Sequence, residues 1–268
     1  MELFVRKYGN APQHLIILHG MYGSGDNWTS IARNLSDGFT VHLPDLRNHG
    51  RSPHSPDHTY ELLAEDIYEF VTGQRIERFY LAGHSMGGKT AMFFARQHPE
   101  MLIKMAAIDI SPRTYHQLNQ LSEQTIFHLN LISYLIRCNV EKAHNYAEAA
   151  SILSEGVPSQ RMVQSLLKNL EKTGDGMMWR INIEALKDNI YAMGDGLDPD
   201  DFIDRKIAVP TLFLRGLKSN YLPVEDEKLI HFIFSNARIV NVPEASHWMH
   251  TEQPEAIVTE LRHFFSED

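Results

Sequence analysis

The sequence predicts an α/β protein in which a mostly parallel sheet is flanked by helices and carries an inserted all-helical lobe. Short apolar runs alternate with segments of helical periodicity in the first two-fifths of the chain and again near its end. Continuous apolar strands of this kind are typical of a parallel sheet that is covered on both faces. A chain of 268 residues is long enough for one large core and such a lobe. We therefore expect a core of residues 1–112 and 196–268 and a lobe of residues 113–195.

Six apolar runs are expected to form the strands of the core. They are HLIILHG (14–20), FTVHLPDL (39–46), ERFYLAGHS (77–85), IKMAAIDIS (103–111), VPTLFLRG (209–216) and ARIVNVPE (237–244). Helical spacing of apolar residues predicts helices over YELLAEDIYEFV (60–71), over GKTAMFFARQH (88–98), near 225–234 and over EAIVTELRHFF (255–265). In the lobe, apolar residues from Val163 to Leu170 recur at helical spacing after Ser159, which suits a helix start.

The composition excludes several function classes. A net charge of −9 argues against a nucleic-acid-binding protein, which would show a basic face. No apolar run approaches the ~18 residues of a membrane span, and the opening MELFVRKYGN lacks the apolar segment of a signal peptide. The single cysteine, Cys138, fits a reducing compartment, so we expect a cytoplasmic protein. The histidines are scattered without a metal-ligand spacing, and we expect neither a metal nor another cofactor.

The pentapeptide Gly83-His84-Ser85-Met86-Gly87 has the G-x-S-x-G pattern of a serine nucleophile. Small residues on both sides of the serine let the chain turn sharply from a strand into a helix, so that the hydroxyl projects above the sheet. The pattern alone is weak, because glycine and serine are also common in flexible loops. Here an apolar run precedes it and a helical pattern follows it, and this context favours Ser85 as a nucleophile.

A serine nucleophile needs hydrogen-bond donors for the oxyanion that forms when it attacks a carbonyl. One expected donor is the backbone N–H of Met86, directly after the nucleophile. The second is the N–H of Met21, in the loop after the first core run, where Gly20 and Gly23 allow a close approach. His19 in the same loop could act as a base, but we favour a role in holding the loop by hydrogen bonds.

Several stretches of the chain resemble a known family of enzymes. His19-Gly20, DLRNHGRS (45–52), GHSMGG (83–88) and a late His247 resemble the α/β-hydrolase fold in order and spacing. More narrowly, DLRNHGRSP, GHSMGGKTAM, AIDISP and WRINIEAL resemble small intracellular esterases of the YbfF type and their mammalian abhydrolase-domain relatives. The resemblance covers essentially the whole chain. It implies hydrolysis of a small-molecule acyl ester or thioester, including acyl-CoA thioesters, with a short to medium acyl chain.

In this fold the catalytic base lies on the loop after the last strand. His247 occupies that position, whereas His250 better suits a surface or capping role. The acid that orients the base can follow either of two strands. The strand over 211–216 is followed by LKSN (217–220), which contains no carboxylate, while the strand beside that of the nucleophile contains Asp109.

Asp109 lies between two isoleucines at the apolar end of its strand, where an unpaired carboxylate would be costly. A hydrogen bond to His247 would offset that cost, and we favour it over a hydrogen bond to nearby Ser111. In YbfF-type esterases the acid follows this earlier strand and a serine takes the later position. The resemblance therefore implies that Ser219 also hydrogen-bonds within the triad. The competing carboxylates are Asp45, Glu225 and Asp226.

The lobe lies where α/β-hydrolases place a cap, and its inward faces would contact the substrate. The expected contacts are Phe127, Tyr134 and Trp179 of the lobe, together with Trp248 beside the base. Alternatively, these side chains only pack the lobe on the core. Ser85 excludes the dehalogenases and epoxide hydrolases of this fold, which need aspartate there. The open alternatives are a C–C hydrolase or lyase on the same triad, a ligand receptor without catalysis, and an interaction protein that uses the lobe.

Overall fold

The core of the protein is a seven-stranded sheet with the strand order β1-β3-β2-β4-β5-β10-β11. The computed structural model describes residues 1–117, 120–174 and 176–267. The strands are β1 (Val5–Tyr8), β2 (His14–Leu18), β3 (Thr40–Pro44), β4 (Phe79–His84), β5 (Leu102–Ile108), β10 (Thr211–Gly216) and β11 (Ala237–Val242). The six expected runs form the six strands that pair in parallel. The sequence does not predict the antiparallel edge strand β1, because VRKY is short and half of it is basic.

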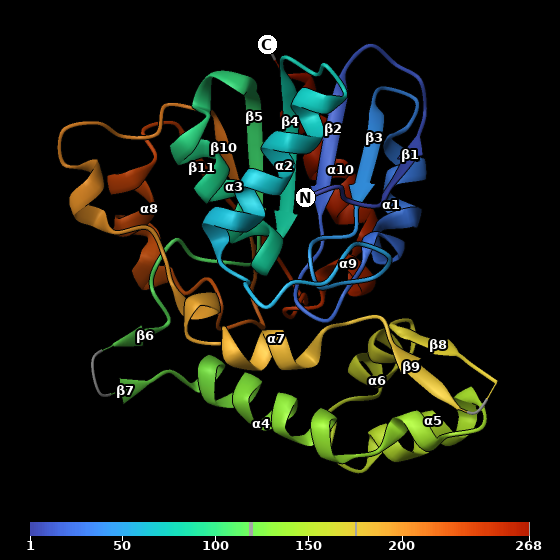
Figure 1. Ribbon diagram of the computed structural model, residues 1–268. Coiled ribbons are helices and arrows are strands. Elements are labelled where there is room, and N and C mark those ends of the chain that lie inside the picture. The colour runs from blue at the N-terminus through green and yellow to red at the C-terminus, as the bar shows by residue number, and fades with distance from the viewer. Residues whose placement is uncertain (118–119, 175, 268) are drawn as a thin grey trace.

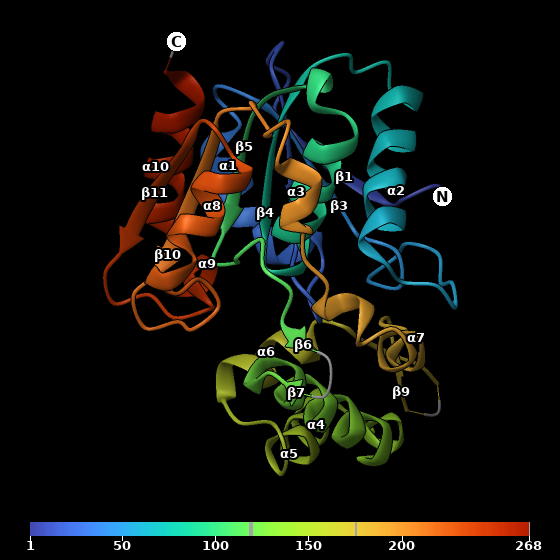
Figure 2. The same ribbon diagram turned by 90° about the vertical axis from the view of Figure 1, so that its left-hand side faces the viewer.

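Helices cover both faces of the sheet (Figures 1 and 2). One face carries α2 (Tyr60–Gly73), α3 (Met86–Gln97) and α8 (Glu227–Ile233), and the other carries α1 (Thr29–Leu35) and α10 (Pro254–Ser266). Successive side chains of a strand point to opposite faces. Leu81 of β4 accordingly packs in the apolar cluster under α2 and α3, whereas Ala82 packs in the cluster under α1 and α10. Strands that are buried on both sides therefore read as continuous apolar runs.

The chain between β5 and β10 forms a cap that lies at the carboxyl ends of the parallel strands (Figures 1 and 2). Its helices are α4 (Glu123–Arg137), α5 (Tyr146–Ser154), α6 (Gln160–Leu167) and α7 (Ile183–Asp188). The sequence predicts an all-helical cap, whereas the cap of the structure is only mainly helical. It also contains two short antiparallel strand pairs, one of β6 (His116–Gln117) with β7 (Gln120–Leu121) and one of β8 (Leu170–Lys172) with β9 (Met177–Trp179). Leu170 thus begins β8 instead of extending α6.

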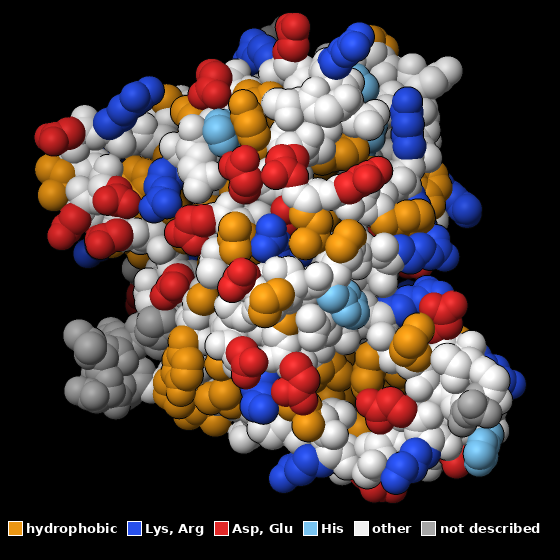
Figure 3. Space-filling model, viewed as in Figure 1, with side chains coloured by type: hydrophobic (Ala, Val, Ile, Leu, Met, Phe, Trp, Pro, Cys, Tyr) orange, Lys and Arg blue, Asp and Glu red, His pale blue; other side chains and the backbone are white. Residues whose placement is uncertain are grey.

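Short helices complete the described chain. They are η1 (Gly25–Trp28), η2 (Pro99–Met101), η3 (Val140–Lys142), η4 (Ala192–Gly194), η5 (Pro199–Phe202), η6 (Val224–Asp226) and α9 (Met249–Glu252). Among the helices of the described residues, none has both the length and the apolar character needed to cross a membrane. On the face shown in Figure 3, acidic and basic side chains are interspersed over core and cap, with no continuous basic patch where residues are described.

Two segments connect the cap to the core, and they lie side by side. Tyr115 N–H donates to Gly194 O at 2.7 Å, and Leu197 N–H donates to Pro112 O at 2.9 Å. These two hydrogen bonds lie close to residues 113 and 195, where the sequence predicts the ends of the cap. We propose 113 and 195 as its boundaries. The two ends of the cap are therefore fastened to each other where they meet the core.

Lys89 of α3 joins both connecting segments to the core. Its side chain is fully buried, and Nζ donates to the carbonyl oxygens of Arg113 and Asp195, the latter at 2.6 Å. Desolvation lowers the pKa of this ammonium to about 7, although the nearby Asp195 carboxylate opposes the shift. A neutral amine still has two N–H donors, which matches the two carbonyl acceptors. Lys89 can therefore hold both ends of the cap without a buried charge.

We expect Lys89 to make the stability of the protein rise with pH. Its pKa is about 7 in the folded protein against an ordinary value of 10.5, so between these values the unfolded chain binds more protons than the folded one. The contribution to the free energy of unfolding then increases by up to about 1.4 kcal/mol per pH unit. Chemical denaturation of the wild type and Lys89→Met across this range should show a difference that grows in favour of the wild type. A difference that is independent of pH would contradict the low pKa.

Candidate active site

Ser85 lies on the sharp turn between β4 and α3. Its φ of +53° and ψ of −119° are an unfavourable conformation for a residue other than glycine. The flanking glycines permit this turn: a Cβ on Gly83 would lie 2.1 Å from Gly87 O, and a Cβ on Gly87 would lie 2.5 Å from Leu18 O. The G-x-S-x-G spacing thus follows from close backbone contacts, which place the serine at the carboxyl end of the sheet.

His247, in the loop between β11 and α9, lies within hydrogen-bond reach of Ser85. Its Nε2 is 2.9 Å from Ser85 Oγ, and its Nδ1 is 2.7 Å from Oδ2 of Asp109. Because a carboxylate only accepts, the neutral ring carries its proton on Nδ1, and Nε2 can accept from the serine hydroxyl. The Tyr221 ring stacks on the imidazole with 3.7 Å between ring centroids. His84 Nε2 donates to the His247 carbonyl at 2.7 Å, so both the ring and the backbone of His247 are held.

Asp109 follows β5 and is fully buried. Its Oδ1 accepts from Gly216 N–H at 3.0 Å, and its Oδ2 accepts from the Ser219 hydroxyl as well as from His247. Ser219 Oγ in turn accepts from Tyr221 N–H at 3.2 Å. The sheet places β5 beside β10, and β10 beside β11, so a side chain at the end of β5 reaches the end of β10 and the loops that follow β10 and β11. Three donors therefore satisfy the buried carboxylate.

The three competing carboxylates lie elsewhere. Asp45 accepts from the backbone N–H groups of Gly25 and Arg51, at 2.7 and 3.0 Å, and so links the segments that contain these two residues. Asp226 lies 3.4 Å from Arg113 Nε, and Glu225 is exposed. Of the four candidate acids, the geometry thus brings Asp109 to the base.

The loop after β2 runs close to the nucleophile. A Cβ on Gly20 would lie 3.2 Å from the Cβ of Ser85, and Gly23 N–H donates to Gly20 O at 3.0 Å, which closes the turn that carries Met21. Met21 and Met86 both line a small cavity at Ser85. Met86 is the first residue of α3, so its N–H has no preceding helical turn to bond to. The two expected oxyanion donors therefore lie on the two segments that border Ser85.

His19 uses both ring nitrogens on the backbone. Nδ1 donates to Gly20 O at 2.9 Å, and Nε2 accepts from Leu46 N–H at 2.9 Å. Burial lowers the pKa of His19 to about 4, so the ring stays neutral near physiological pH. These contacts agree with the expected role of His19 in holding the loop.

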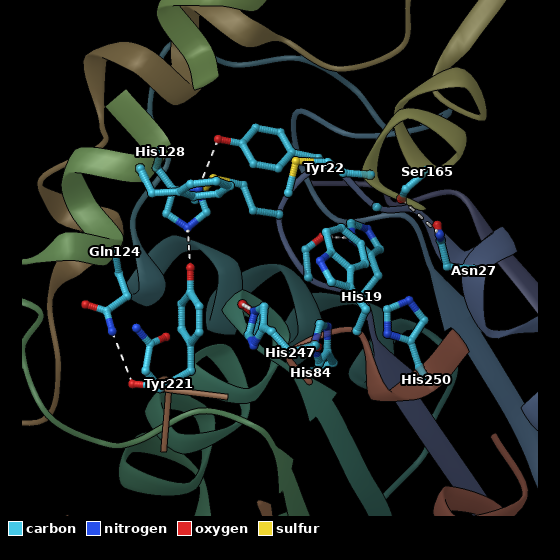
Figure 4. A pocket seen from close by; sticks show the side chains of 18 of the residues that line it. His19, Tyr22, Asn27, His84, Gln124, His128, Ser165, Tyr221, His247 and His250 are labelled. Atoms are coloured by element: carbon cyan, nitrogen blue, oxygen red, sulfur yellow. Dashed lines mark hydrogen bonds between the residues drawn. The ribbon is translucent and has the colours of Figure 1, made fainter. Parts of the chain in front are cut away.

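A cavity of about 400 Å³ lies beside Ser85, between the core and the cap (Figure 4). Aromatic, histidine and small polar side chains make up most of its wall. They include Tyr22, Asn27, Trp28, Gln124, Phe127, His128, Ser165, Asn220, Tyr221, His247, Trp248 and His250, and the apolar Met162 also lines the cavity. The wall combines apolar surface with polar groups that can orient a ligand, which is typical of a small-molecule site.

Two of the four expected substrate contacts line this cavity, namely Phe127 of α4 and Trp248. Tyr134 does not, because it lies seven residues further along α4, about 10 Å away along the helix axis. Its hydroxyl and ring contact α5 and the turn after it. Trp179 lies on β9 and packs with the apolar cluster of the cap. For Tyr134 and Trp179 the structure therefore favours the alternative of packing within the cap.

The sequence does not predict the contact between the cap and the base. His128 of α4 lies between two tyrosines, with Nδ1 3.2 Å from the Tyr22 hydroxyl and Nε2 3.1 Å from the Tyr221 hydroxyl (Figure 4). Burial lowers the pKa of His128 to about 3, so the neutral ring donates at one nitrogen and accepts at the other. Tyr221 also stacks on His247, and the cap is thereby linked to the base. No local pattern signals this contact, because its members come from distant segments.

His250 is buried, in contrast to the expected surface or capping role. It is 6% exposed and stacks on Trp28 with 5.2 Å between ring centroids. The helix α9 that contains it has only four residues, so helical periodicity gives little indication of its environment. Burial lowers the pKa of His250 to about 3 and the pKa of His84 well below its ordinary value. These rings therefore add polar but uncharged surface to the cavity.

Comparisons with known proteins confirm the predicted fold and the resemblance to YbfF-type esterases. Residues 13–130 match the family described as the alpha/beta hydrolase fold. The sn-1-specific diacylglycerol lipase ABHD11 of Danio rerio is 34% identical over 262 residues, which cover 94% of this chain and 78% of that protein. The esterase YbfF of Escherichia coli is 29% identical, with 100% of each chain covered. The solved structure of a marine microorganism esterase is 42% identical, with a TM-score of 0.92, and covers 98% of this chain and 99% of that one. The chain therefore belongs to the α/β-hydrolase fold family, in which its relatives include esterases and lipases.

Proposed function

We propose that the protein is a serine carboxylesterase that hydrolyses acyl esters through an acyl-enzyme on Ser85. The proposal rests on the unbroken chain of hydrogen bonds from Ser85 Oγ through His247 to Asp109, at 2.9 and 2.7 Å. Ser85 and His247, which form the first of these hydrogen bonds, line the cavity of about 400 Å³. The esterases and lipases among the relatives support the same reaction class. In this proposal Ser85 is the nucleophile, His247 the base and Asp109 the acid, with Ser219 as a neutral fourth member.

The proposed reaction follows the usual steps of ester cleavage by a serine enzyme. Ser85 Oγ attacks the ester carbonyl while His247 Nε2 takes the hydroxyl proton, and Asp109 stabilises the imidazolium that forms. The oxyanion accepts hydrogen bonds from the N–H groups of Met21 and Met86. When the tetrahedral intermediate collapses, the bond to the alcohol breaks and the alcohol takes the proton from His247. Water then attacks the acyl-enzyme, His247 takes a proton from it and returns one to Ser85, and the carboxylic acid leaves.

The charge of the cavity wall favours uncharged esters. Among the lining residues of the described chain, Glu123 is the only carboxylate and none is lysine or arginine. The buried histidines of the wall are neutral at physiological pH, as their lowered pKa values indicate. We therefore propose neutral substrates, and the resemblance to YbfF-type esterases supports short to medium acyl chains. Acyl thioesters react by the same steps with a thiol as leaving group, and we propose them as further substrates.

We also propose that the enzyme acts in the cytosol on small molecules, without a nucleic-acid partner. Cys138 is a free, half-buried thiol whose pKa burial raises, which suits an inert residue in a reducing compartment.

Replacement of the nucleophile tests the proposed reaction. Ser85→Ala should abolish covalent labelling by a fluorophosphonate probe and reduce the hydrolysis of p-nitrophenyl esters by about 10⁴-fold or more, because no acyl-enzyme can form. Labelling is read by gel fluorescence and turnover by p-nitrophenolate release. A wild type that is neither labelled nor active would favour the ligand receptor. A labelled wild type that hydrolyses no ester or thioester would favour the C–C hydrolase or lyase.

Replacement of the acid tests the assignment of Asp109. Asp109→Asn should lower kcat on p-nitrophenyl esters by about 10³–10⁴-fold, because the amide cannot hold the required imidazole tautomer or stabilise the imidazolium. Asp226→Asn, the matched change at a competing carboxylate, should keep near-wild-type kcat. Circular dichroism and thermal unfolding show whether each variant is folded. Near-wild-type turnover in folded Asp109→Asn would move the acid to another residue.

A further inference from the structure

Two cavities of different size open on Ser85. The large cavity, of about 400 Å³, has His247 and Trp248 in its wall. The small cavity, of about 40 Å³, has Met86 and Ile110 in its wall. Ser85 lines both cavities, so an ester bound at its hydroxyl could extend one arm into each.

The chemistry of ester cleavage assigns one arm to each cavity, and this step rests on the proposed function. His247 Nε2 must give its proton to the leaving oxygen, so the alcohol arm lies on the side of His247. Among the described residues, His247 lines the large cavity and not the small one. The small cavity instead has Met86 in its wall, and Met21, the other proposed oxyanion donor, lines both cavities. The acyl arm therefore extends away from His247 into the small cavity.

We infer that the small cavity is the acyl site and restricts the enzyme to short acyl chains, with the larger, uncharged group of the ester on the alcohol side. A group the size of a water molecule needs about 10–15 Å³ of cavity volume. A cavity of about 40 Å³ therefore admits roughly three such groups beyond the carbonyl carbon, which corresponds to an acyl chain of up to about four carbon atoms. This limit is narrower than the short to medium acyl range of the proposed function.

The wall of the small cavity is held in place by the end of the cap. Ile190 and Met193 line it and are 3% and 6% exposed. The hydroxyl of Tyr60 donates to Met193 O at 2.9 Å, and Met193 N–H donates to Asn189 O at 3.0 Å. Both hydrogen bonds hold the backbone of Met193 in place beside the cavity. Removal of the Met193 side chain is therefore a direct way to lengthen the site.

The experiment compares two substrate series on the purified full chain. The first varies the acyl group of p-nitrophenyl esters from acetate through butyrate and hexanoate to octanoate. The second keeps acetate and enlarges a primary alkyl alcohol from ethanol to octanol, so that the acidity of the leaving alcohol stays nearly constant. We expect kcat/KM of the wild type to fall by about tenfold or more between butyrate and hexanoate, and to show no comparable fall as the alcohol grows.

Met193→Ala should raise the ratio of kcat/KM for hexanoate to that for acetate by about tenfold, since each further buried methylene group is worth roughly fourfold. The matched control is Met162→Ala, because Met162 is also 6% exposed but lines the large cavity. It should leave this acyl ratio unchanged and alter only the response to the size of the alcohol. Ile190→Ala enlarges the same wall as Met193→Ala and replaces that variant if it does not fold.

The outcomes separate this inference from the proposed function. A wild type that hydrolyses octanoate as well as acetate overturns the inference and leaves the esterase intact. The ratio of kcat/KM for hexanoate to that for acetate could instead rise in Met162→Ala and not in Met193→Ala or Ile190→Ala. This result would overturn the inference, because it would place the acyl group in the large cavity. If no ester of either series is hydrolysed and fluorophosphonate does not label Ser85, the proposed function fails and the inference fails with it.

Discussion

The buried carboxylate of Asp109 is the group on which the geometry of the active site depends. A fully buried charge is stable only when hydrogen bonds or an opposite charge replace its hydration. Here the donors are Gly216 N–H, the Ser219 hydroxyl and His247 Nδ1. They come from the end of β10, from the loop after β10 and from the loop after β11. The Asp109 carboxylate therefore holds the loop after β10, the loop after β11 and the ring of His247 in fixed positions relative to one another.

The order of the strands explains why the position after β10 can be neutral. Ile108 at the end of β5 pairs with β4 on one side and β10 on the other. Ser85 N–H accordingly donates to Ile108 O at 3.1 Å, and Asp109 N–H donates to Leu214 O at 2.8 Å. The proposed nucleophile, Ser85, and the proposed acid, Asp109, are thus both bonded to the end of β5 or follow it directly. A second carboxylate at position 219 would place like charges together and raise the pKa of one of them, whereas Ser219 donates a hydrogen bond.

The sequence predicts those parts of the structure that have a local cause. Continuous apolar runs mark the strands buried on both faces, and the turn at Ser85 needs small residues at fixed positions. Asp109 could be predicted because a carboxylate in an apolar strand end needs a partner. The sequence could not predict which residues of the cap line the cavity. Periodicity shows that residues share a helix face, but not which part of that face lies over a cavity. For this reason the sequence does not reveal that Tyr134 lies away from the large cavity. The contacts of His128 and His250 join segments that are distant in sequence, and they leave no local pattern.

The proton on His247 gives the most direct test of whether Asp109 is the acid. Proton spectra of the protein with isotope-labelled histidine report which ring nitrogen is protonated and how strongly that proton is hydrogen-bonded. The wild type should show a strongly downfield proton on Nδ1 of His247, because this nitrogen lies 2.7 Å from the carboxylate. The signal should move upfield or vanish in Asp109→Asn and stay nearly unchanged in Asp226→Asn. A proton on Nε2 in the wild type, or an Nδ1 signal that persists unchanged in Asp109→Asn, would contradict the assignment.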